Sequence, residues 1–453
     1  MNCSVDERHD LIRAELERID SVDPSSDAFC RKHRKMSANP MRFLRGSAQL
    51  FYTDIQRGTF PLPSALVEAP PLTTVMGDCH VSNFGFVTEQ GSHGDRVVFC
   101  PNDYDDACIG PAVWDLARYI VSLLVAAEYG RGVLARNYRS DEITDTSGLK
   151  AVSPAEALNA AQEFLAAYRH TCRQSVRDPD LHMIALDHFR KKHVLRDLLR
   201  KARRRASGGK DFETKSTLAK DTEIRRDRPC FRDRPKRFHR LEPRRAEAVR
   251  HAFRPYVGDE ILDLVQRLGA GTGSVNLQRF YLLVGPADFS GPADLPLCHV
   301  VEVKQQRPAA ALFRFPDVSP VNRLNPAHLT VDCQRLMQRS PDLVLDEAFW
   351  DGEHWLIRSR QHARVGVEPE EIALARKNPA RRLIQYARAC GKALALAHAR
   401  GDRRSPRFEA AMTDQLKVHA DELLASARRY ARQVRADQRL LRGMLVEGRP
   451  GSH

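Results

Sequence analysis

Apolar residues recur at helical spacing along much of the chain. In residues 6–20, for example, Leu11, Ile12, Leu16 and Ile19 fall three or four positions apart, which is typical of an amphipathic helix. A broader apolar face marks residues 40–54 in the same way. Further helices are predicted over residues 111–128, 154–170, 181–205, 379–398 and 406–444.

Strands are predicted where apolar and β-branched residues alternate. Two short strands frame a polar loop in TTVMGDCHVSNFGFV and RVVFC, which lie between residues 72 and 100 with the turn GSHGD between them. A strand-rich unit begins near Leu268, with RLGAGTGSVNLQRFYLLV and LCHVVEVKQQ. Further along, Asp351-Gly352 in DEAFWDGEHWLIRS predicts a hairpin.

The length of the chain predicts more than one lobe. Its 453 residues exceed the size at which single hydrophobic cores stop growing, about 250–300 residues. A run of basic residues between about 186 and 255 favours a connector there, in part mobile. The predicted division is an N-terminal helical segment (1–70), the first part of a helical lobe (71–205), a basic connector (206–255), a strand-rich lobe (256–360) and C-terminal helices that complete the helical lobe (361–453).

Composition excludes several classes of protein. Hydrophobic residues at 42% and charged residues at 29% argue against a fibrous or disordered chain. The sequence has no run of 18 consecutive apolar residues, so we expect no membrane-spanning helix. The ten cysteines are scattered without a CxxC pair, and the charged N-terminus lacks the apolar core of a signal peptide. We therefore expect reduced thiols and a cytoplasmic protein.

The net charge of +14 leaves several partners open. It permits a nucleic-acid, anionic-membrane or phosphorylated partner without indicating any one of them. The basic residues between 190 and 245 are interleaved with Phe231, Phe238 and His239, which is compatible with nucleic-acid binding. No recognisable nucleic-acid-binding motif accompanies them, so a solvated surface is the favoured interpretation.

The densest polar constellation combines two short motifs. Gly77-Asp78-Cys79-His80-Val81-Ser82-Asn83 is followed about twenty residues later by Asn102-Asp103-Tyr104-Asp105-Asp106. Carboxylates and a carboxamide at neighbouring strand ends suit Mg²⁺, which takes oxygen ligands and leaves room for substrate phosphates. Each motif alone is equally compatible with an Asx turn or an acidic turn.

A second constellation could approach phosphates. Residues 269–274, GAGTGS, open a strand, and Lys304 lies on a later strand. Glycines allow a backbone to approach phosphates closely, and a lysine can pair with them. The pattern matches neither the dinucleotide-binding fingerprint nor the Walker motif, and a hairpin connection with an edge-strand lysine stays open as the alternative.

These motifs together resemble a known family. GDCHVSNFG looks like the catalytic loop of the aminoglycoside-phosphotransferase and protein-kinase-like superfamily, and NDYDDACIGPAVWDLA looks like its metal-binding segment. The combination of FLRG, GDCHVSNFG, NDYDDACIGPAVWDL, VEVK and DCQRLMQ is more specifically similar to the bacterial family DUF2252, over roughly residues 30–440. The resemblance implies a two-lobed α+β protein-kinase-like fold.

The resemblance also implies roles for individual residues. Asp78 would be the catalytic aspartate, while Asn83 and Asp103 would bind Mg²⁺. Either Asp105 or Asp106 could share metal binding. Asp115 would support the catalytic loop. The remaining implied residues would contact the nucleotide: Gly269, Gly271, Gly273, Ser274 and Lys304, with Asp332 on a helix pairing with the lysine.

Two departures from the superfamily pattern stand out. The glycine-rich loop and the lysine follow the catalytic loop here, by roughly 190 residues in the case of the loop, so the order looks circularly permuted. The C-terminal helix RRLIQYARACGKALALAHARGD resembles the one that normally precedes the catalytic loop, which makes a permutation coherent. In addition, Asp332 is shorter than the usual glutamate, and the glycine loop ends in Ser274.

Several neighbouring residues have weaker signals. His80 could contact phosphate, although a loop histidine bonded to local backbone is the commoner arrangement. Cys79 is rejected as a nucleophile because no histidine–carboxylate pair accompanies it. Arg42 and Arg45 could reach a substrate anion or be solvated helix charges.

The expected activity is Mg²⁺-dependent phosphoryl transfer from ATP to a hydroxyl or amine of a small molecule or protein. A nucleotide-binding pseudoenzyme, a nucleic-acid-binding protein acting through residues 190–245, and transfer of AMP in place of phosphate are the alternatives. A kinase-like fold hosts several chemistries, so the fold alone does not decide among them.

Overall fold

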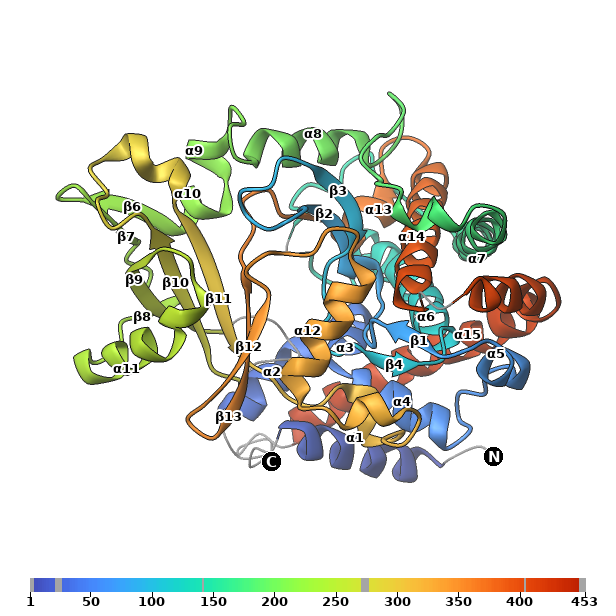
Figure 1. The fold of residues 1–453 in the computed structure, drawn as a ribbon. Helices are drawn as coiled ribbons and strands as arrows, with labels where there is room; N and C mark the ends of the chain where they lie inside the picture. The colour runs from blue at the N-terminus through green and yellow to red at the C-terminus, as the bar shows by residue number, and fades with distance from the viewer. Residues whose placement is uncertain (1–3, 21–26, 141, 270–276, 403–404, 448–453) are drawn as a thin grey trace.

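The protein consists of a helical region and a sheet-rich region, as its computed structural model shows (Figure 1). The structure describes residues 4–20, 27–140, 142–269, 277–402 and 405–447. Helices account for 53% and strands for 16%, so the chain is of the predicted α+β class. In Figure 1 the sheet lies on the left and the long helices lie on the right.

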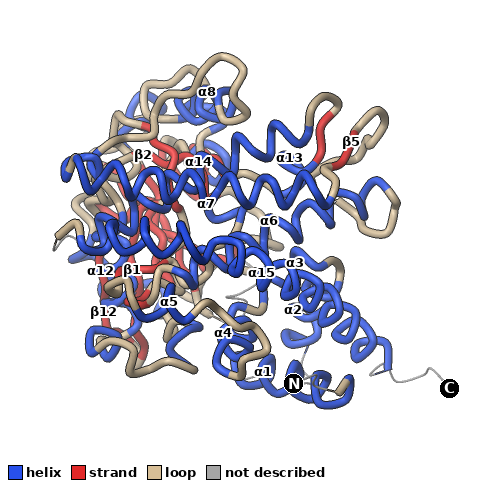
Figure 2. Tube along the Cα trace, turned by 90° about the vertical axis from the view of Figure 1, so that its right-hand side faces the viewer, coloured by secondary structure: helices blue, strands red, loops and turns tan. Residues whose placement is uncertain are grey.

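Four long helices form the centre of the helical region. They are α6 (Val113–Leu134), α7 (Pro154–Arg177), α14 (Pro379–Asp402) and α15 (Arg407–Glu447), and they pack against one another (Figure 2). Their apolar faces share one core. The N-terminal helices join the same core, namely α1 (Val5–Asp20), α2 (Asp27–Ser37), α3 (Pro40–Gly46), α4 (Ala48–Gln56) and α5 (Ser64–Glu68).

Two predicted helices differ from the structure. The helix predicted over residues 40–54 divides into α3 and α4 at Ser47, whose backbone leaves helical geometry and whose N–H bonds to Leu44 O. The helix predicted over 181–205 begins only at Arg196, as α8 (Arg196–Arg205). The preceding segment instead lies against strand β3 (Val97–Pro101), where Leu186 O accepts a hydrogen bond from Phe99 N. Tertiary contacts therefore override local helical spacing there.

The sheet-rich region is built on six antiparallel strands. In spatial order they are β12 (Asp346–Trp350), β13 (Glu353–Ser359), β11 (His299–Gln305), β10 (Arg279–Gly285), β9 (Glu260–Arg267) and β8 (Phe238–His239). Asp351 and Gly352, both with positive φ, form the tight turn between β12 and β13, which confirms the predicted hairpin.

Helices cover the two faces of this sheet. On one face, Val249 and Phe253 of α11 (Pro243–Phe253) join a core with Phe280 and Trp355. On the other face, α12 (Pro326–Met337) contacts β12 and β13, and its Val331 packs with Leu356. Because side chains alternate along a strand, this second face also carries the polar residues Glu302 and Lys304 of β11.

The basic segment 206–255 is folded into the sheet-rich region, contrary to the predicted connector. It forms α9 (Phe212–Lys215), α10 (Thr217–Asp221), β6 (Thr222–Arg225), β7 (Arg228–Phe231), β8 and α11. Several of its arginines pair with acids, among them Arg237 with Asp221 at 2.8 Å and Arg240 with Asp263 at 2.6 Å. Local charge density did not reveal these partners, which lie 16 and 23 residues away in the two pairs named.

Short ladders within the helical region position the loops described below. β1 (Thr73–Val75) pairs with β4 (Cys108–Gly110), and β2 (Phe84–Thr88) pairs with β3 on one side and β14 (Val365–Gly366) on the other. The remaining short elements are β5 (Lys150–Ala151), β15 (Leu374–Ala375) and α13 (Pro369–Ala373).

In the described part of the chain, no helix combines the length and apolar character needed to cross a lipid bilayer.

Candidate functional site

Two polar loops approach each other between the short ladders. The first connects β1 to β2 and contains Asp78 and Asn83; the second connects β3 to β4 and contains Asp103 and Asp105. At one end Asn102 N donates to Asn83 O at 3.0 Å. The two motifs that lie twenty residues apart in sequence are therefore neighbours in space.

Gly77 makes this approach possible at the other end of the loops. Its φ is +73°, in the region that favours glycine, and a Cβ at this position would lie 1.8 Å from the carbonyl oxygen of Asp106. Any larger residue at position 77 would push the second loop away from Asp78.

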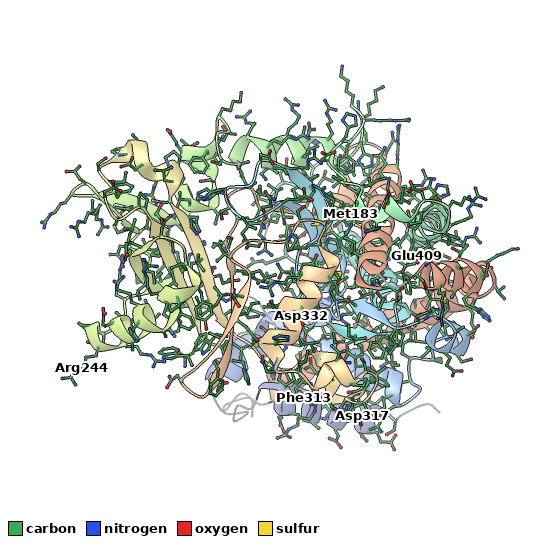
Figure 3. The ribbon with its side chains drawn as sticks, in the orientation of Figure 1. Met183, Arg244, Phe313, Asp317, Asp332 and Glu409 are labelled. Carbon is green, nitrogen blue, oxygen red and sulfur yellow. The ribbon has the colours of Figure 1, made fainter. Side chains whose placement is uncertain are left out.

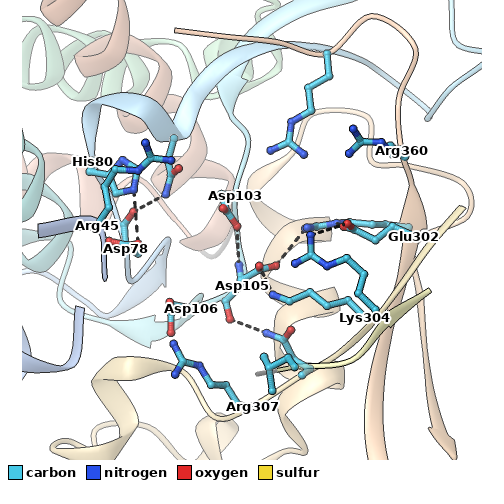
Figure 4. A pocket seen from close by; sticks show the side chains of 16 residues that line it. Arg45, Asp78, His80, Asp103, Asp105, Asp106, Glu302, Lys304, Arg307 and Arg360 are labelled. Carbon is cyan, nitrogen blue, oxygen red and sulfur yellow. Dashed lines mark hydrogen bonds and ion pairs between the residues drawn. The ribbon is translucent and has the colours of Figure 1, made fainter. Parts of the chain in front are cut away.

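A cavity of about 230 Å³ lies between these loops and the six-stranded sheet (Figure 4). The loops supply most of one wall, which we call the loop wall, and Arg45 of α3 adds to it. Strands β10, β11 and β13 supply the opposite side, the sheet wall. The loop wall includes Arg45, Asp78, His80, Asn83, Asp103 and Asp106; the sheet wall includes Arg279, Glu302, Lys304 and Arg358.

Asp78 is held from two sides. Its Oδ1 accepts a hydrogen bond from Arg118 Nε at 2.6 Å, and Arg118 is fully buried on α6. Its Oδ2 faces His80 Nε2 at 3.6 Å. Asn83 Nδ2 donates to the backbone oxygen of Asp78 at 2.9 Å, so the amide fixes the loop and its own oxygen is left for another donor or a cation.

His80 is a neutral imidazole in this setting. Burial, together with the nearby charges of Arg45 and Arg118, holds its pKa well below the usual value. Its Nδ1 accepts a hydrogen bond from Ser82 N at 3.2 Å, which places the ring proton on Nε2, toward Asp78.

Asp115 supports the first loop from the start of α6. Its two carboxylate oxygens accept hydrogen bonds from Met76 N at 2.7 Å and from Gly77 N at 3.1 Å. His398 Nε2 of α14 lies 3.1 Å from the same carboxylate, and Tyr168 lies on the other side of that imidazole. These buried groups fix the backbone immediately before Asp78.

The charged groups of the sheet wall are paired with one another and with the second loop. Lys304 Nζ bonds to Asp105 Oδ2, and Arg358 lies 3.3 Å from Asp105 Oδ1. Glu302 is paired with Arg279 at 3.0 Å and with Arg358 at 2.9 Å. Burial opposes ionisation of Asp105, but the charges of Lys304 and Arg358 outweigh it and lower the pKa of this carboxyl well below its usual range.

Asp103 differs from Asp105 because no cation pairs with it among the described residues. Its Oδ1 accepts a hydrogen bond from Asp105 N at 3.3 Å. Burial and the negative charge of Asp105 raise the pKa of the Asp103 carboxyl to about 6. A cation beside Asp103 would remove this penalty.

The oxygen donors near Asp103 fit a magnesium ion only in part. Within the described residues, no group of three or more His, Cys, Asp or Glu side chains is arranged to hold a metal ion. Asn83 and Asp103 supply two oxygen donors, and Mg²⁺ commonly takes its other ligands from substrate phosphates and water. Asp105, the third predicted ligand, is already paired with Lys304 and Arg358.

Asp332 does not serve as the partner of Lys304. Figure 3 labels it on α12, where it is 40% exposed and pairs with His328 Nε2 at 3.0 Å, four residues earlier on the same helix. The carboxylate at Lys304 is that of Asp105. Asp332 does not pair with Lys304 because it lies on the exposed side of α12. The sequence spacing between the strand and the helix does not determine which side of the helix faces the strand.

The predicted glycine loop can be placed only at its start. Gly269 has a φ of +63° and does not line the cavity, whereas Gly271, Gly273 and Ser274 lie outside the described residues. Leu277, the first described residue after this loop, lines the cavity.

Cys79 is fully buried, and this burial raises the pKa of its thiol well above the usual value, so it stays protonated.

Sequence reasoning missed Arg118, Glu302 and Arg358. Arg118 has a recognisable signal, since it is the sole basic residue in the apolar run AVWDLARYIVSLLVAA. Its position three residues after Asp115 places both on neighbouring parts of one helix face. Arg358 and Glu302 could be found only after the strand register was known, because they are directly opposite each other on β13 and β11.

Comparison with protein families gives one match that covers most of the chain. The family described as "Uncharacterized protein conserved in bacteria (DUF2252)" matches residues 25–137 and 147–443. The chain belongs to the DUF2252 family. The match includes both polar loops, the sheet wall and Arg118, so the whole cavity lies within the DUF2252 region. Comparison with curated proteins and with solved structures gives no match.

Proposed function

We propose that this DUF2252 protein is a Mg²⁺-dependent phosphotransferase that uses ATP and acts on a hydroxyl or amine acceptor. The single observation that supports this most is the meeting of Asp78, Asn83, Asp103 and Lys304 in one cavity. They come from three segments, and Asp78 and Lys304 are 226 residues apart in sequence. Each has the chemistry that phosphoryl transfer needs. The resemblance of both loops to the kinase-like superfamily, in permuted order, is consistent with this proposal.

Each residue has a distinct role in the proposed reaction. Lys304 would neutralise charge on the phosphates, having exchanged its bond to Asp105 for one to the nucleotide. Asp78 Oδ2, free of Arg118, would accept the proton or hydrogen bond of the acceptor hydroxyl. Asn83 and Asp103 would hold Mg²⁺, which when bound neutralises charge on the transferred group.

The preorganisation of Asp78 is the main contribution of the protein scaffold in this proposal. Arg118 fixes one carboxylate oxygen, and Asp115 fixes the backbone before it. A carboxylate that is already oriented needs no rearrangement as the acceptor attacks, and positioning of this kind supplies much of the rate of phosphoryl transfer.

The test is to measure binding and turnover separately. Purified protein is incubated with Mg·ATP, and ADP formation is followed while small hydroxyl and amine compounds are added. Wild type should form ADP, and Asp78→Asn should bind Mg·ATP with unchanged affinity while its turnover falls by about 10²–10⁴-fold. Equal turnover in Asp78→Asn and wild type would contradict the assignment of Asp78.

A nucleotide-binding pseudoenzyme is the second candidate. Two observations favour it: Lys304 is bonded to Asp105, and Asp78 is bonded to Arg118. In that case Mg·ATP would stabilise the protein, and no ADP would form with any acceptor. Transfer of AMP would instead be recognised by release of pyrophosphate.

Nucleic-acid binding by residues 190–245 is less well supported, because several arginines of this segment have acidic partners within the fold. If the protein bound a random oligonucleotide at low salt and lost most of this binding at physiological salt, nucleic-acid binding would become the favoured function.

A further inference from the structure

Arg45 is a cation of the loop wall that lacks a partner. It lies on α3, is half-buried, lines the cavity, and has no hydrogen bond or ion pair to any residue that the structure describes. The cavity-lining cations of the strands offer a contrast, since Arg279, Lys304 and Arg358 all bond to carboxylates. Arg307 and Arg364, which lie outside the strands, also line the cavity without an ion pair among the described residues. A half-buried guanidinium with an open donor fork is well suited to bind a carboxylate or phosphate group.

The position of Arg45 is tied to that of Asp78. Arg118 donates from Nε to Asp78 Oδ1 at 2.6 Å and from Nη2 to Leu44 O at 2.9 Å, so a single buried side chain holds both the carboxylate and the residue before Arg45. Asn39 caps the start of α3 by accepting from Arg42 N at 2.8 Å. The separation between Arg45 and Asp78 is therefore set by the fold.

Other charged groups nearby do not satisfy Arg45. Neither His80 nor Asp78 forms a hydrogen bond or ion pair with Arg45, and Asp78 pairs with Arg118 instead. The charge of Arg45 acts on Glu368, but the two form no ion pair. The positive charge of Arg45 therefore has no ion-pair partner among the described residues and is available to bind an anionic ligand.

Arg45 also lies on the acceptor side of the cavity. Figure 4 shows it beside Asp78 and His80, across the cavity from Lys304 and Glu302. In the proposed reaction the nucleotide phosphates bind near Lys304 and Asp103, and the attacking group binds at Asp78. An anion at Arg45 would therefore belong to the acceptor.

We propose that the acceptor is a small molecule that carries a carboxylate or phosphate close to its reacting hydroxyl or amine, and that Arg45 binds this anionic group. The inference rests on the proposed function, since Asp78 defines where the acceptor binds. The cavity of about 230 Å³ must also admit the terminal phosphates of ATP, which favours a small acceptor. Arg45 is then a specificity-determining residue.

The experiment uses matched pairs of neutral and anionic probes. Thermal unfolding of the full chain is measured first with Mg·ADP alone, and then with glycerol, glycerate or glycerol 3-phosphate added. The variants are Arg45→Gln, Arg45→Lys and Arg57→Gln, the last removing an exposed charge that does not line the cavity. Glycerate and glycerol 3-phosphate separate a carboxylate from a phosphate preference.

The expected result is a stabilisation of wild type by an anionic probe and not by glycerol. Arg45→Gln should weaken this effect by roughly 10- to 100-fold in probe concentration, because a charge-assisted hydrogen bond is lost. Arg45→Lys should retain part of it, and Arg57→Gln should behave as wild type. Binding of Mg·ADP should be equal in all four proteins.

Three results would overturn the inference while leaving the proposed function intact. They are Mg·ADP binding without any response to the anionic probes, an equal response of wild type and Arg45→Gln to these probes, or weaker Mg·ADP binding in Arg45→Gln, which would assign Arg45 to the nucleotide. Absence of Mg·ADP binding in wild type would reject the proposed function itself, and the inference with it.

Discussion

The two walls of the cavity differ in how their charges are compensated. On the sheet wall, Glu302 and Lys304 project from one face of β11, and each has an oppositely charged partner. On the loop wall, Asp103, Asp106 and Arg45 have no ion-pair partner among the described residues. The charged side chains of β10, β11 and β13 in the cavity are thus compensated without a ligand, whereas the loop wall has two acidic groups and one basic group without an ion pair.

This difference indicates which wall would respond to a ligand. A strand register fixes Glu302 directly opposite Arg358, so the sheet wall is preorganised by backbone pairing. The loop wall depends on close approach of two loops, and its Asp103 carries an electrostatic penalty that a cation would relieve. Single substitutions on and around the two walls test this difference.

The largest effect is expected from Gly77→Ala. The new methyl group would overlap the Asp106 carbonyl oxygen, and the positive φ would add strain, so the free energy of unfolding should fall by about 3–5 kcal/mol. Denaturant unfolding measures this loss. Gly58→Ala is a matched control, because its φ is +72° but nothing lies within 4 Å of the new Cβ. Equal losses in the two variants would show that backbone strain alone, and not contact between the loops, matters.

Lys304→Ala should have the next largest effect. It leaves Asp105 with Arg358 as its remaining cation and should lower the free energy of unfolding by about 2–3 kcal/mol, while stabilisation by Mg·ATP disappears. Thermal unfolding with and without Mg·ATP measures both.

A third change concerns the histidines where the sheet meets the β2–β3 loop. Burial, reinforced by the charge of His93, lowers the pKa of His299 to about 4 and that of His362 to about 3. In the unfolded chain these side chains bind protons near pH 6.5, so stability should fall as the pH drops below that value. For His362 the loss should be about 2 kcal/mol at pH 5.

His362→Phe isolates this contribution. Within the described structure neither ring nitrogen of His362 has a hydrogen-bond partner, so an apolar ring should be tolerated at neutral pH. Denaturant unfolding at pH 7.5 and pH 5 should show a smaller acid-induced loss than in wild type. An identical loss in both proteins would contradict the assigned pKa shift.

Asp332→Ala should have the smallest effect. Its ion pair with His328 is 40% exposed on both sides, so the loss should stay below about 1 kcal/mol, and Mg·ATP binding should be unchanged. If this substitution abolished Mg·ATP binding, Asp332 and not Asp105 would be the functional partner of Lys304.

Periodicity predicted most of the fold. Long amphipathic segments such as α7, α14 and α15 form as expected, and so does the Asp351-Gly352 hairpin, because local spacing and turn chemistry decide them. The segment 181–205 and the basic residues 206–255 were predicted incorrectly, since their structure depends on partners far away in sequence.

The candidate site was predictable to the extent that its residues form motifs. Asp78, Asn83 and Asp103 line the same cavity as Lys304. Residues of a single site have to meet in this way. The pairing of Lys304 with Asp105, and the roles of Arg118 and Arg358, follow from side-chain direction and strand register. These depend on the three-dimensional packing and leave little trace in the spacing of residues.

The proposed nucleotide site is tested most directly by thermal unfolding of wild type and Asp103→Asn with ATP, in Mg²⁺ or in EDTA. At about 100 times the dissociation constant, Mg·ATP should add about 2.7 kcal/mol to the apparent stability of wild type. EDTA or Asp103→Asn should remove this gain, while Asp103→Asn remains folded. No shift of wild type in millimolar Mg·ATP, or an equal shift in Asp103→Asn, would contradict the proposed nucleotide site.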